Sequence, residues 1–563
     1  MSKQKKAKAQ RAAAKDAPQA APDRTEIWLS KNGKWLLLAG WLFFLALYMS
    51  LATDELGGVL GGDNARYIML SRGLASGKGY TDYFFPGAPA HTQYPFLFPL
   101  LLSAFSGSGK QVFYSHLLIQ LIASLVPLLL CAWARLSGES RLKSLLVFFL
   151  AGSIPAWYSF LLNLLTEPLF MFFMFAAFAV ISWCKLRGFN IYWAIILSLC
   201  IWASAMVREV GLVVFGAVFL GMLLEPGLRK VRVAKVPLVA VVSIIFILGW
   251  GAWTARNLVV GEGGFYFKQL LQKNPYQPEL GWINLGDFIT RLNINAGLHI
   301  PHVGGFAFPP WIFKTNSAAV AVGLIFLAVM AIGLVERMRS KNFVAELAFI
   351  FLSGVAAVWY FQEHRFSLPI LPLAAFYFLK GLDGLAKLFK ARSQALTIAA
   401  ALLLIVWQTG FTGWLCYKYH QKQIFPRSSV TIEGFGPWTQ PVLDASKYSE
   451  YWKWQDDFWS FTADAIILQK IASQYLPKDA VIACRKPTLA WYFADRKATW
   501  YKFGVTPEAQ WLHFKEKGIT HILVSSANQE LTAMIKAYPE NFRFIALIER
   551  SGQGLAKVEY PKE

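Results

Sequence analysis

The sequence predicts an α-helical polytopic membrane protein that carries a small α/β domain outside the membrane. Of the 563 residues, 56% are hydrophobic and only 16% are charged, whereas soluble proteins carry roughly 25% charged residues. Apolar runs of about 20 residues, long enough to cross a bilayer, recur as far as Tyr417. Helix-like and strand-like segments alternate only near the C-terminus, which is typical of a small α/β fold.

The apolar runs predict about eleven membrane spans, within a range of about 11–13. They are Trp35–Leu51, Val112–Ala134, Leu145–Asn163, Pro168–Lys185, Tyr192–Met206, Gly211–Leu224, Val236–Thr254, Ala318–Val335, Val344–Phe361, Ser367–Leu379 and Ala395–Tyr417. Phe96–Phe105 is too short to cross alone. The chain therefore divides into a disordered basic cytoplasmic tail (1–34), a transmembrane domain (35–417) and a C-terminal domain (418–563).

The net charge is +22, and the positions of the basic residues match the topology of these spans. Basic residues gather in the N-terminal tail and in alternate loops, around Arg141, Lys185, Arg232, Arg339 and Lys387. Loops of this kind face the cytoplasm, so the N-terminus is expected inside and the C-terminal domain outside. This pattern argues against nucleic-acid binding. The five cysteines show neither metal-ligand spacing nor a disulfide framework.

The same topology places loops 52–111 and 255–317 outside the membrane, together with several charged residues beside the span ends. They are Asp63, Arg66, Glu167, Arg208, Glu209, Arg256, Glu363, His364 and Arg365. An ionisable group at membrane depth costs about 2.5–3.5 kcal/mol on insertion scales, so such groups usually pair or function. We expect them to form one site at the outer mouth of the bundle.

Most of these residues also have a structural interpretation. Arg208 and Glu209 fit a local ion pair, Glu167 fits a charge at a helix start, and Arg256 fits a residue that extends toward the interface. A lone His91 or His364 is more often structural than functional. Asp63 is harder to explain in this way, because it follows Gly61 and Gly62 and has no partner next in sequence. The helix expected after it, Asn64–Ala75, is amphipathic and is expected to lie in the membrane interface.

Two outer segments complete the architecture. Glu262–Asn316 is a long stretch rich in Gly, Pro and aromatic residues, and it is interpreted as a lid or a disordered loop. The C-terminal domain is expected to contain helices at Phe461–Tyr475, Pro487–Phe493, Pro507–Lys517 and Gln529–Ala537, and strands at Ala480–Ala483, Ile519–Val524 and Phe542–Ile548. It has no nucleotide-binding fingerprint, so we interpret it as a support or acceptor-recognition module.

Several motifs together resemble the polytopic GT-C glycosyltransferases. They are Gly62-Asp63-Asn64-Ala65-Arg66-Tyr67, Gly77-Lys78-Gly79-Tyr80, Tyr94-Pro95, Thr166-Glu167-Pro168-Leu169, Ala255-Arg256-Asn257, His364-Arg365-Phe366-Ser367-Leu368-Pro369 and Cys484-Arg485-Lys486-Pro487. Within that group the chain is most similar to bacterial relatives of the protein O-mannosyltransferases and of the lipid A aminoarabinose transferase. The resemblance covers about residues 35–560, and it rests on the order of the motifs and their shared outer face.

The resemblance implies an inverting glycosyltransferase of the bacterial inner membrane. It would move a sugar from a polyprenyl (undecaprenyl) monophosphate carrier to an envelope lipid or glycan at the periplasmic face. Asp63 would be the general base, Glu167 would orient a substrate, and Arg365, Arg256 and Arg208 would bind the donor phosphate. The residues expected to bind the rest of the substrates are Arg66, Tyr67, Tyr80, His91, Tyr94, Glu209 and His364.

Many members of the group carry a second acid directly after the first, where this chain has Asn64. This departure removes one possible proton acceptor or metal ligand, so we expect no cofactor and no metal site. The charge distribution described above leads us to expect no nucleic-acid partner. Three alternatives stay open at this point: a protein O-glycosyltransferase with the same mechanism, a lipid or sugar transporter (flippase) without transferase activity, and a non-catalytic assembly subunit. A transporter would place charges near the bilayer midplane and show inverted repeats.

Overall fold

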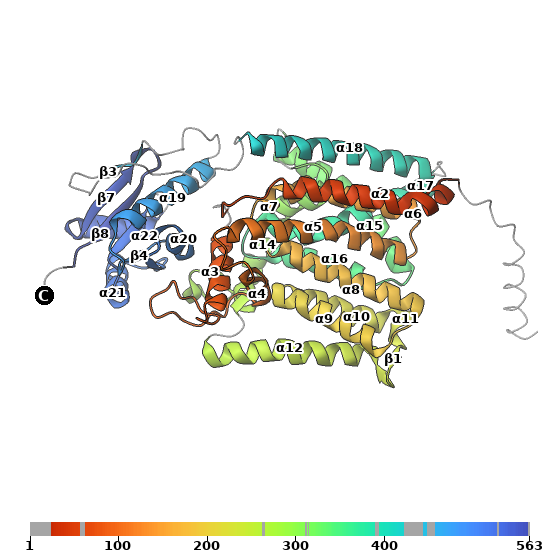
Figure 1. Cartoon of the computed structure of the whole chain (residues 1–563), viewed down its shortest axis with the longest axis horizontal. Coiled ribbons are helices and arrows are strands. Elements are labelled where there is room, and N and C mark those ends of the chain that lie inside the picture. The colour runs from red at the N-terminus through yellow and green to blue at the C-terminus, as the bar shows by residue number, and fades with distance from the viewer. Residues whose placement is uncertain are drawn as a thin grey trace, which may run out of the picture.

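The computed structural model describes residues 24–56, 62–261, 265–309, 312–313, 315–388, 393–421, 443–446, 457–525 and 528–560. These residues form a helical bundle and an α/β part that lies against one end of the bundle (Figure 1). Predictions that fall on residues 1–23, 422–442 and 447–456 lie outside the described residues.

The bundle contains seven helical segments that, among the described residues, are long and apolar enough to cross a membrane. They comprise α2 (Arg24–Met49), α5 (Gln111–Leu136), α8 (Glu167–Arg187), α12 (Leu238–Val260), α15 (Asn316–Arg339), η4 with α17 (His364–Ile370 and Leu371–Leu388) and α18 (Ser393–His420). Three shorter apolar helices stand among them, α9 (Ile191–Val207), α10 (Gly211–Leu224) and α16 (Val344–Val358).

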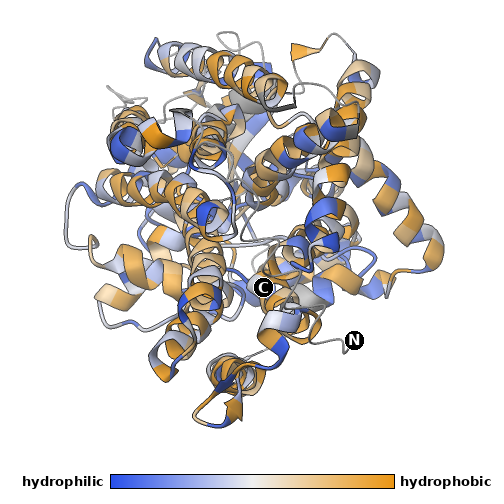
Figure 2. Ribbon diagram, turned by 90° about the vertical axis from the view of Figure 1, so that its right-hand side faces the viewer, coloured by the Kyte–Doolittle hydropathy of each residue, from blue (hydrophilic) through white to orange (hydrophobic). Residues whose placement is uncertain are grey.

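The arrangement of these helices places apolar surface on the outside of the bundle. The apolar stretches of α5, α8 and the segment with α17 are 56–78% buried, whereas those of α2, α12, α15 and α18 are only 17–22% buried. Large apolar side chains such as Trp35, Ile247 and Leu403 are exposed on the outer helices, and Figure 2 shows apolar residues along many of the helices. Such a surface is unfavourable in water, and it identifies a multi-pass membrane protein.

Leu145–Asn163 and Trp35–Leu51 are among the predicted spans whose bounds the structure corrects. Leu145–Asn163 is not one helix: α6 (Arg141–Gly152) ends before Ile154, and α7 (Pro155–Leu161) begins at a proline, which restricts the residue before it away from helical angles. The helix that contains most of the predicted span Trp35–Leu51, α2, begins at Arg24, so the predicted disordered tail is wrong for residues 24–34. Glu26 accepts a hydrogen bond from the Leu142 backbone, a tertiary contact that hydropathy does not detect.

The helix that begins at Asp63 is buried on its polar face, which the prediction of an amphipathic helix in the membrane interface did not anticipate. In α3 (Asp63–Ala75) the polar Asn64, Arg66 and Ser71 are buried along with the apolar residues. α3 lies between the bundle and the α/β part, next to α4 (Leu97–Ser103) (Figure 1). Arg66 is satisfied there by Asp82, 2.7 Å away, so the polar face of α3 packs inside the protein.

The long segment after α12 also has more regular structure than predicted. It contains α13 (Phe265–Leu271), η1 (Pro278–Leu280), α14 (Leu285–His299) and a π-helical turn, η2 (Ile300–Gly304). α14 begins with a reciprocal capping box, in which Asn284 and Asp287 each accept the other's backbone N–H. The spacing of Asn284 and Asp287 is visible in the sequence and is typical of a capping box. The segment is nevertheless interpreted from the sequence as an irregular loop because of its many Gly, Pro and aromatic residues. At the far end of the bundle, α11 (Pro226–Arg229) leads into the hairpin β1–β2 (Arg232–Val233 and Val236–Pro237).

The α/β part is a six-stranded mixed sheet with the strand order β3-β7-β8-β6-β4-β5. The strands are β3 (Leu443–Asp444), β4 (Val481–Ala483), β5 (Lys497–Thr499), β6 (His521–Val524), β7 (Phe542–Ile548) and β8 (Gln553–Val558). Its helices are α19 (Asp457–Tyr475), α20 (Pro487–Ala494), α21 (Pro507–Lys517) and α22 (Gln529–Ala537). All seven predicted elements are present, and β3, β5 and β8 are additional.

The α/β part contacts the loop that follows α3 through aromatic side chains and one backbone hydrogen bond. Trp500 packs on Phe85 with ring centroids 4.6 Å apart, Trp491 packs edge-on against Tyr83, and the Ala498 N–H donates to the Phe84 carbonyl at 3.1 Å. A Cβ on Gly62, the residue before α3, would stand 3.7 Å from both Lys486 and Leu489 at the beginning of α20. The two parts therefore also meet beside Asp63.

Candidate functional site

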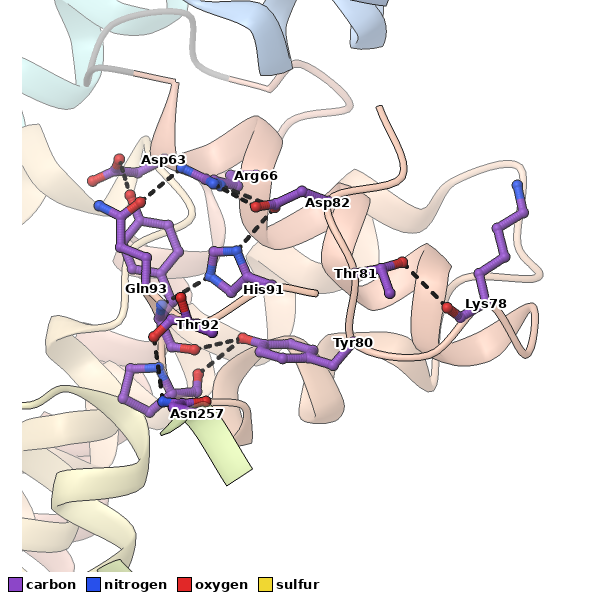
Figure 3. Close-up of polar contacts among 12 residues, drawn as sticks. Asp63, Arg66, Lys78, Tyr80, Thr81, Asp82, His91, Thr92, Gln93 and Asn257 are labelled. Carbon is purple, nitrogen blue, oxygen red and sulfur yellow. Dashed lines mark hydrogen bonds and ion pairs between the residues drawn. The ribbon is translucent and has the colours of Figure 1, made fainter. Parts of the chain in front are cut away.

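The first loop, the outer segment 52–111 between α2 and α5, contains a buried polar network around Asp82 (Figure 3). Arg66 and the His91 ring nitrogen Nδ1 both donate to the Asp82 carboxylate, at 2.7 and 2.9 Å. His91 Nε2 accepts the Tyr94 backbone N–H at 2.8 Å, so the ring is the neutral tautomer with its proton on Nδ1. Burial lowers the pKa of His91 to about 4 despite Asp82. This network fixes the position of Tyr94.

Asp63 is the first residue of α3, and both of its carboxylate oxygens are hydrogen-bonded. The Tyr94 hydroxyl donates to Oδ1 at 2.7 Å, and Arg365 Nη1 donates to Oδ2 at 2.7 Å. Burial alone would raise the pKa of Asp63, but the charge of Arg365, these two hydrogen bonds and the charge of Lys486 outweigh it and hold the pKa below its ordinary value. Asp63 is therefore ionised, and 16% of its side chain remains exposed.

The exposed part of Asp63 faces a cavity of about 910 Å³ between the bundle and the α/β part. Three groups of residues line it. The bundle contributes an apolar side that includes Leu212, Val213, Trp250, Leu352 and Val355. The segment after α12 contributes Gln269, Tyr276 and Glu279, and the α/β part contributes Arg485, Lys486, Thr488, Trp500, Tyr501 and Lys502. One cavity is thus lined both by charged side chains and by an apolar side.

The structure brings together on this cavity eight of the residues that the sequence singled out for a site. They are Asp63, Arg66, Tyr67, Tyr94, Arg208, Glu209, Glu363 and Arg365. Arg365 also pairs with Glu363, at 2.8 Å between Nε and Oε2. Asp63 and Arg365 stand 302 positions apart in the sequence, so their direct contact is a product of the fold.

The other predicted site residues do not line the cavity. Glu167 is 1% exposed and pairs with Arg208, which also donates to Thr166. Arg256 donates to the backbone carbonyls of His91 and Tyr80, at 2.5 and 3.2 Å. These contacts favour a role for Arg256 in holding the first loop, and its guanidinium is not part of the cavity lining.

Tyr80 and His91 likewise serve the first loop. The Tyr80 hydroxyl donates to the carbonyls of Tyr94 and Pro95, and His91 supports Tyr94 as described above. His364 precedes Arg365, and its ring lies 4.8 Å from that of His302, centroid to centroid. These geometries favour positioning roles for Tyr80 and His91 over direct substrate contact.

The position after Asp63 is turned away from the cavity. The Asn64 side chain is buried and donates to the Leu56 carbonyl at 3.0 Å and to Asn163 at 3.1 Å. Among the described residues, no group of three or more His, Cys, Asp or Glu side chains is placed to hold a metal ion. The expectation that the chain has no metal site stays a prediction.

The sequence placed Arg485 and Lys486 in a motif but gave the cations of the α/β part no role in the site. Arg485 and Lys486 stand between β4 and α20, and Lys502 follows β5. Because β4 and β5 are parallel neighbours, the residues after their carboxyl ends gather at one edge of the sheet, where ligands bind in open α/β sheets. That rule applied to the predicted strand Ala480–Ala483 would have singled out Arg485 and Lys486.

No protein-family model and no curated protein sequence matches this chain. Solved structures do. The chain is similar to the structure of ArnT from Cupriavidus metallidurans bound to undecaprenyl phosphate, with a TM-score of 0.54 and 12% identity over 94% of this chain and 99% of that chain. It is also similar to the Archaeoglobus fulgidus oligosaccharyltransferase tethered with an acceptor peptide containing the NVT sequon, with a TM-score of 0.51 and 13% identity over 94% of this chain and 75% of that chain. Both are GT-C glycosyltransferases, and at these identities the likeness establishes the architecture: the chain has the GT-C fold.

Proposed function

We propose that this protein is an inverting glycosyltransferase that takes a sugar from a polyprenyl monophosphate carrier. The observation that carries the proposal is a cavity that contains the ion pair of Asp63 and Arg365 and has an apolar side formed by the bundle. An apolar side suits a polyprenyl chain, and a guanidinium in the same cavity suits the phosphate that the chain carries. The similar ArnT structure is bound to undecaprenyl phosphate, which supports a carrier of this class.

In the proposed reaction an acceptor hydroxyl attacks the anomeric carbon of the sugar from the face opposite the phosphate. Its proton moves to the Asp63 carboxylate as the new carbon–oxygen bond forms. The bond between the anomeric carbon and the phosphate oxygen breaks, and its electron pair stays on the phosphate. General-base help of this kind is worth roughly 10²–10⁴-fold in rate. Arg365 stabilises the negative charge that develops on the leaving phosphate.

The ion pair between Asp63 and Arg365 links the basicity of Asp63 to the charge on the leaving phosphate. While Arg365 donates to Asp63, the carboxylate is held ionised and is a weak base. A phosphate that gains negative charge beside Arg365 competes for the same guanidinium and leaves Asp63 less stabilised. The pKa of Asp63 therefore rises as the leaving group departs, at the moment when it must accept a proton.

We further propose that this end of the bundle faces the periplasm of a bacterial inner membrane and that the acceptor is an envelope lipid or glycan. The basic loops at the opposite end support this orientation. The acceptor would enter from the side of the α/β part, where the Trp500 side chain is 42% exposed and offers a flat surface for a sugar ring. A protein acceptor would fit the same chemistry.

The first experiment is a transfer assay with purified protein, polyprenyl-phosphate sugars as donors and washed envelopes as the source of acceptor. Asp63→Asn should lower the transfer rate by roughly 10²–10⁴-fold, and Arg365→Ala should lower it comparably. The matched control is Asp54→Asn, an exposed aspartate in the same loop outside the cavity lining, which should retain activity. Wild-type transfer that persists in both Asp63→Asn and Arg365→Ala would refute the proposed roles, and no transfer from any carrier would favour a transporter.

A further inference from the structure

The cavity holds two sets of cations that differ in their partners. The arginines from the bundle and the first loop each face a carboxylate: Arg365 faces Asp63 and Glu363, Arg208 faces Glu167, and Arg66 faces Asp82. Their positive charge is already largely balanced by protein groups. A phosphate in the cavity would have to compete with these carboxylates for each of them.

The second set comes from the α/β part and is not balanced in this way. Arg485, Lys486 and Lys502 all line the cavity, and none of the three forms an ion pair with a carboxylate of the described residues. By contrast, Lys478, an exposed lysine of the same part, pairs with Asp495 at 2.8 Å. The unbalanced positive charge of the cavity therefore sits on its α/β wall.

Lys486 is the member of this set that lies nearest the reacting groups. Its side chain lies against Gly62, the residue before Asp63: a Cβ at Gly62 would stand 3.7 Å from Lys486 Cδ. Gly62 adopts φ +86° there, a conformation that glycine adopts at no steric cost. The charges of Asp63, Glu363 and Arg365 all act on the Lys486 ammonium, so it stands in the same cavity as the ion pair.

The electrostatic state of Lys486 indicates what it would bind. Burial lowers the pKa of Lys486, and the charges of Arg485 and Arg365 lower it further, while Asp63 and Glu363 only partly offset them. An ammonium in that position is stabilised by an anion that enters the cavity. Arg485 is exposed beside it, with its charge acting on Tyr276 and Tyr501, and it widens the same positive wall.

We propose that Lys486, with Arg485 beside it, binds the phosphate of the polyprenyl carrier opposite Arg365, so that the donor site is assembled from both parts of the protein. This proposal rests on the proposed function and changes one expectation from the sequence: the α/β part contributes to donor binding and is more than a support or acceptor module. A phosphate between Arg365 and Lys486 meets a cation on each side, which matches the second negative charge that it gains when the sugar leaves.

The test compares Lys486→Gln, Lys486→Arg and the control Lys478→Gln with the wild type, as full-length protein in lipid nanodiscs. Binding of a polyprenyl phosphate and of the matching polyprenol, which lacks the phosphate, is measured for each. Lys486→Gln should weaken polyprenyl phosphate binding by about 10–100-fold, the loss expected for one charged hydrogen bond. It should leave polyprenol binding unchanged. Lys486→Arg should restore most of the affinity, and Lys478→Gln should match the wild type.

The outcomes separate this inference from the proposed function. If Lys486→Gln binds polyprenyl phosphate as the wild type does, the inference is wrong, and the proposed function stands on the transfer assay. A loss of polyprenol binding in the same variant would show a damaged fold and overturn a specific role for the lysine. If the wild type does not prefer polyprenyl phosphate over polyprenol, the proposed function itself is refuted.

Discussion

Tyr94 connects the first-loop network to the proposed base. Its backbone N–H is held by His91, and its hydroxyl donates to Asp63 Oδ1. Arg66 also lies over the Tyr94 ring, with its guanidinium carbon 5.5 Å from the ring centroid. Tyr94 therefore influences the ionisation of Asp63 without taking part in the proton transfer.

Removing the Tyr94 hydroxyl should change the pH dependence of catalysis. In Tyr94→Phe, Asp63 loses one of the two hydrogen bonds that lower its pKa, so its pKa rises. Asp63 acts in its ionised form, and the acidic limb of the transfer rate should therefore move to higher pH. The measurement is kcat against pH, with Tyr114→Phe, an exposed tyrosine on α5, as the control. An unshifted limb would argue against Asp63 as the titrating base.

The lowered pKa of His91 predicts that the free energy of unfolding decreases as the pH falls. The pKa of His91 in the folded protein is lowered from 6.5 to about 4, so between these values the unfolded chain binds more protons than the folded one. Its stabilising contribution is complete above pH 6.5 and is lost as pH falls toward 4. At about 1.36 kcal/mol per pKa unit, the full loss is about 3 kcal/mol.

The check is the apparent Tm across this pH range for the wild type, His91→Asn and His420→Asn. His91→Asn should show a smaller decrease in Tm than the wild type. His420 is exposed at the end of α18, so its variant should follow the wild type. The pKa of Asp82 is lowered to about 2, so its protonation affects stability only at pH values below this range. Equal slopes in all three proteins would contradict the role given to His91.

Among the elements, those specified by local patterns were predictable and those specified by tertiary contacts were not. α22 and β7 have the predicted bounds, because hydrophobic periodicity and the residues that end helices and strands define them locally. α3 was placed in the membrane interface, because the sequence shows Arg66 and Ser71 as a polar face and does not show Asp82 and Gln111 as their buried partners. Asp63 and Arg365 were expected at one mouth of the bundle, but their direct pairing depends on how the helices pack. Lys486 was given no role in the site because the edge of the sheet it occupies is defined by strand order.

The crossing of α15 and α17 depends on glycines. A Cβ on Gly381 would collide with the Val329 carbonyl, and one on Gly333 would collide with the Tyr377 carbonyl. Close approach of this kind is typical of membrane helices with small residues at the contact. Gly381→Ala should therefore cost about 1–3 kcal/mol through overpacking, seen as a lower apparent Tm.

Gly410→Ala on α18 is the matched control, because no heavy atom lies within 4 Å of the added Cβ. Alanine at such a site is neutral or slightly stabilising in a helix. If both variants had the same Tm as the wild type, the α15–α17 contact would be looser than described.

At the scale of the whole molecule, the first loop is held between the bundle and the α/β part. The aromatic contacts of Trp491 and Trp500 and the hydrogen bond from Ala498 to Phe84 join the loop to the sheet. A chain that ends after Tyr419 should therefore show faster amide hydrogen exchange in residues 79–95 and lose transfer activity. Full activity in the shortened chain would exclude the α/β part from the donor site.

The distance in sequence between the two sides of the Asp63–Arg365 pair has a consequence for biosynthesis. Arg365 is made 302 residues after Asp63, which at about 5–20 residues per second is a delay of roughly 15–60 s. The pair Arg66–Asp82 closes within 16 residues, so the loop around it forms early. Asp63 is therefore synthesised well before Arg365, the residue with which it pairs. During that interval the Asp63 carboxylate lacks the partner whose charge does most to lower its pKa in the folded protein.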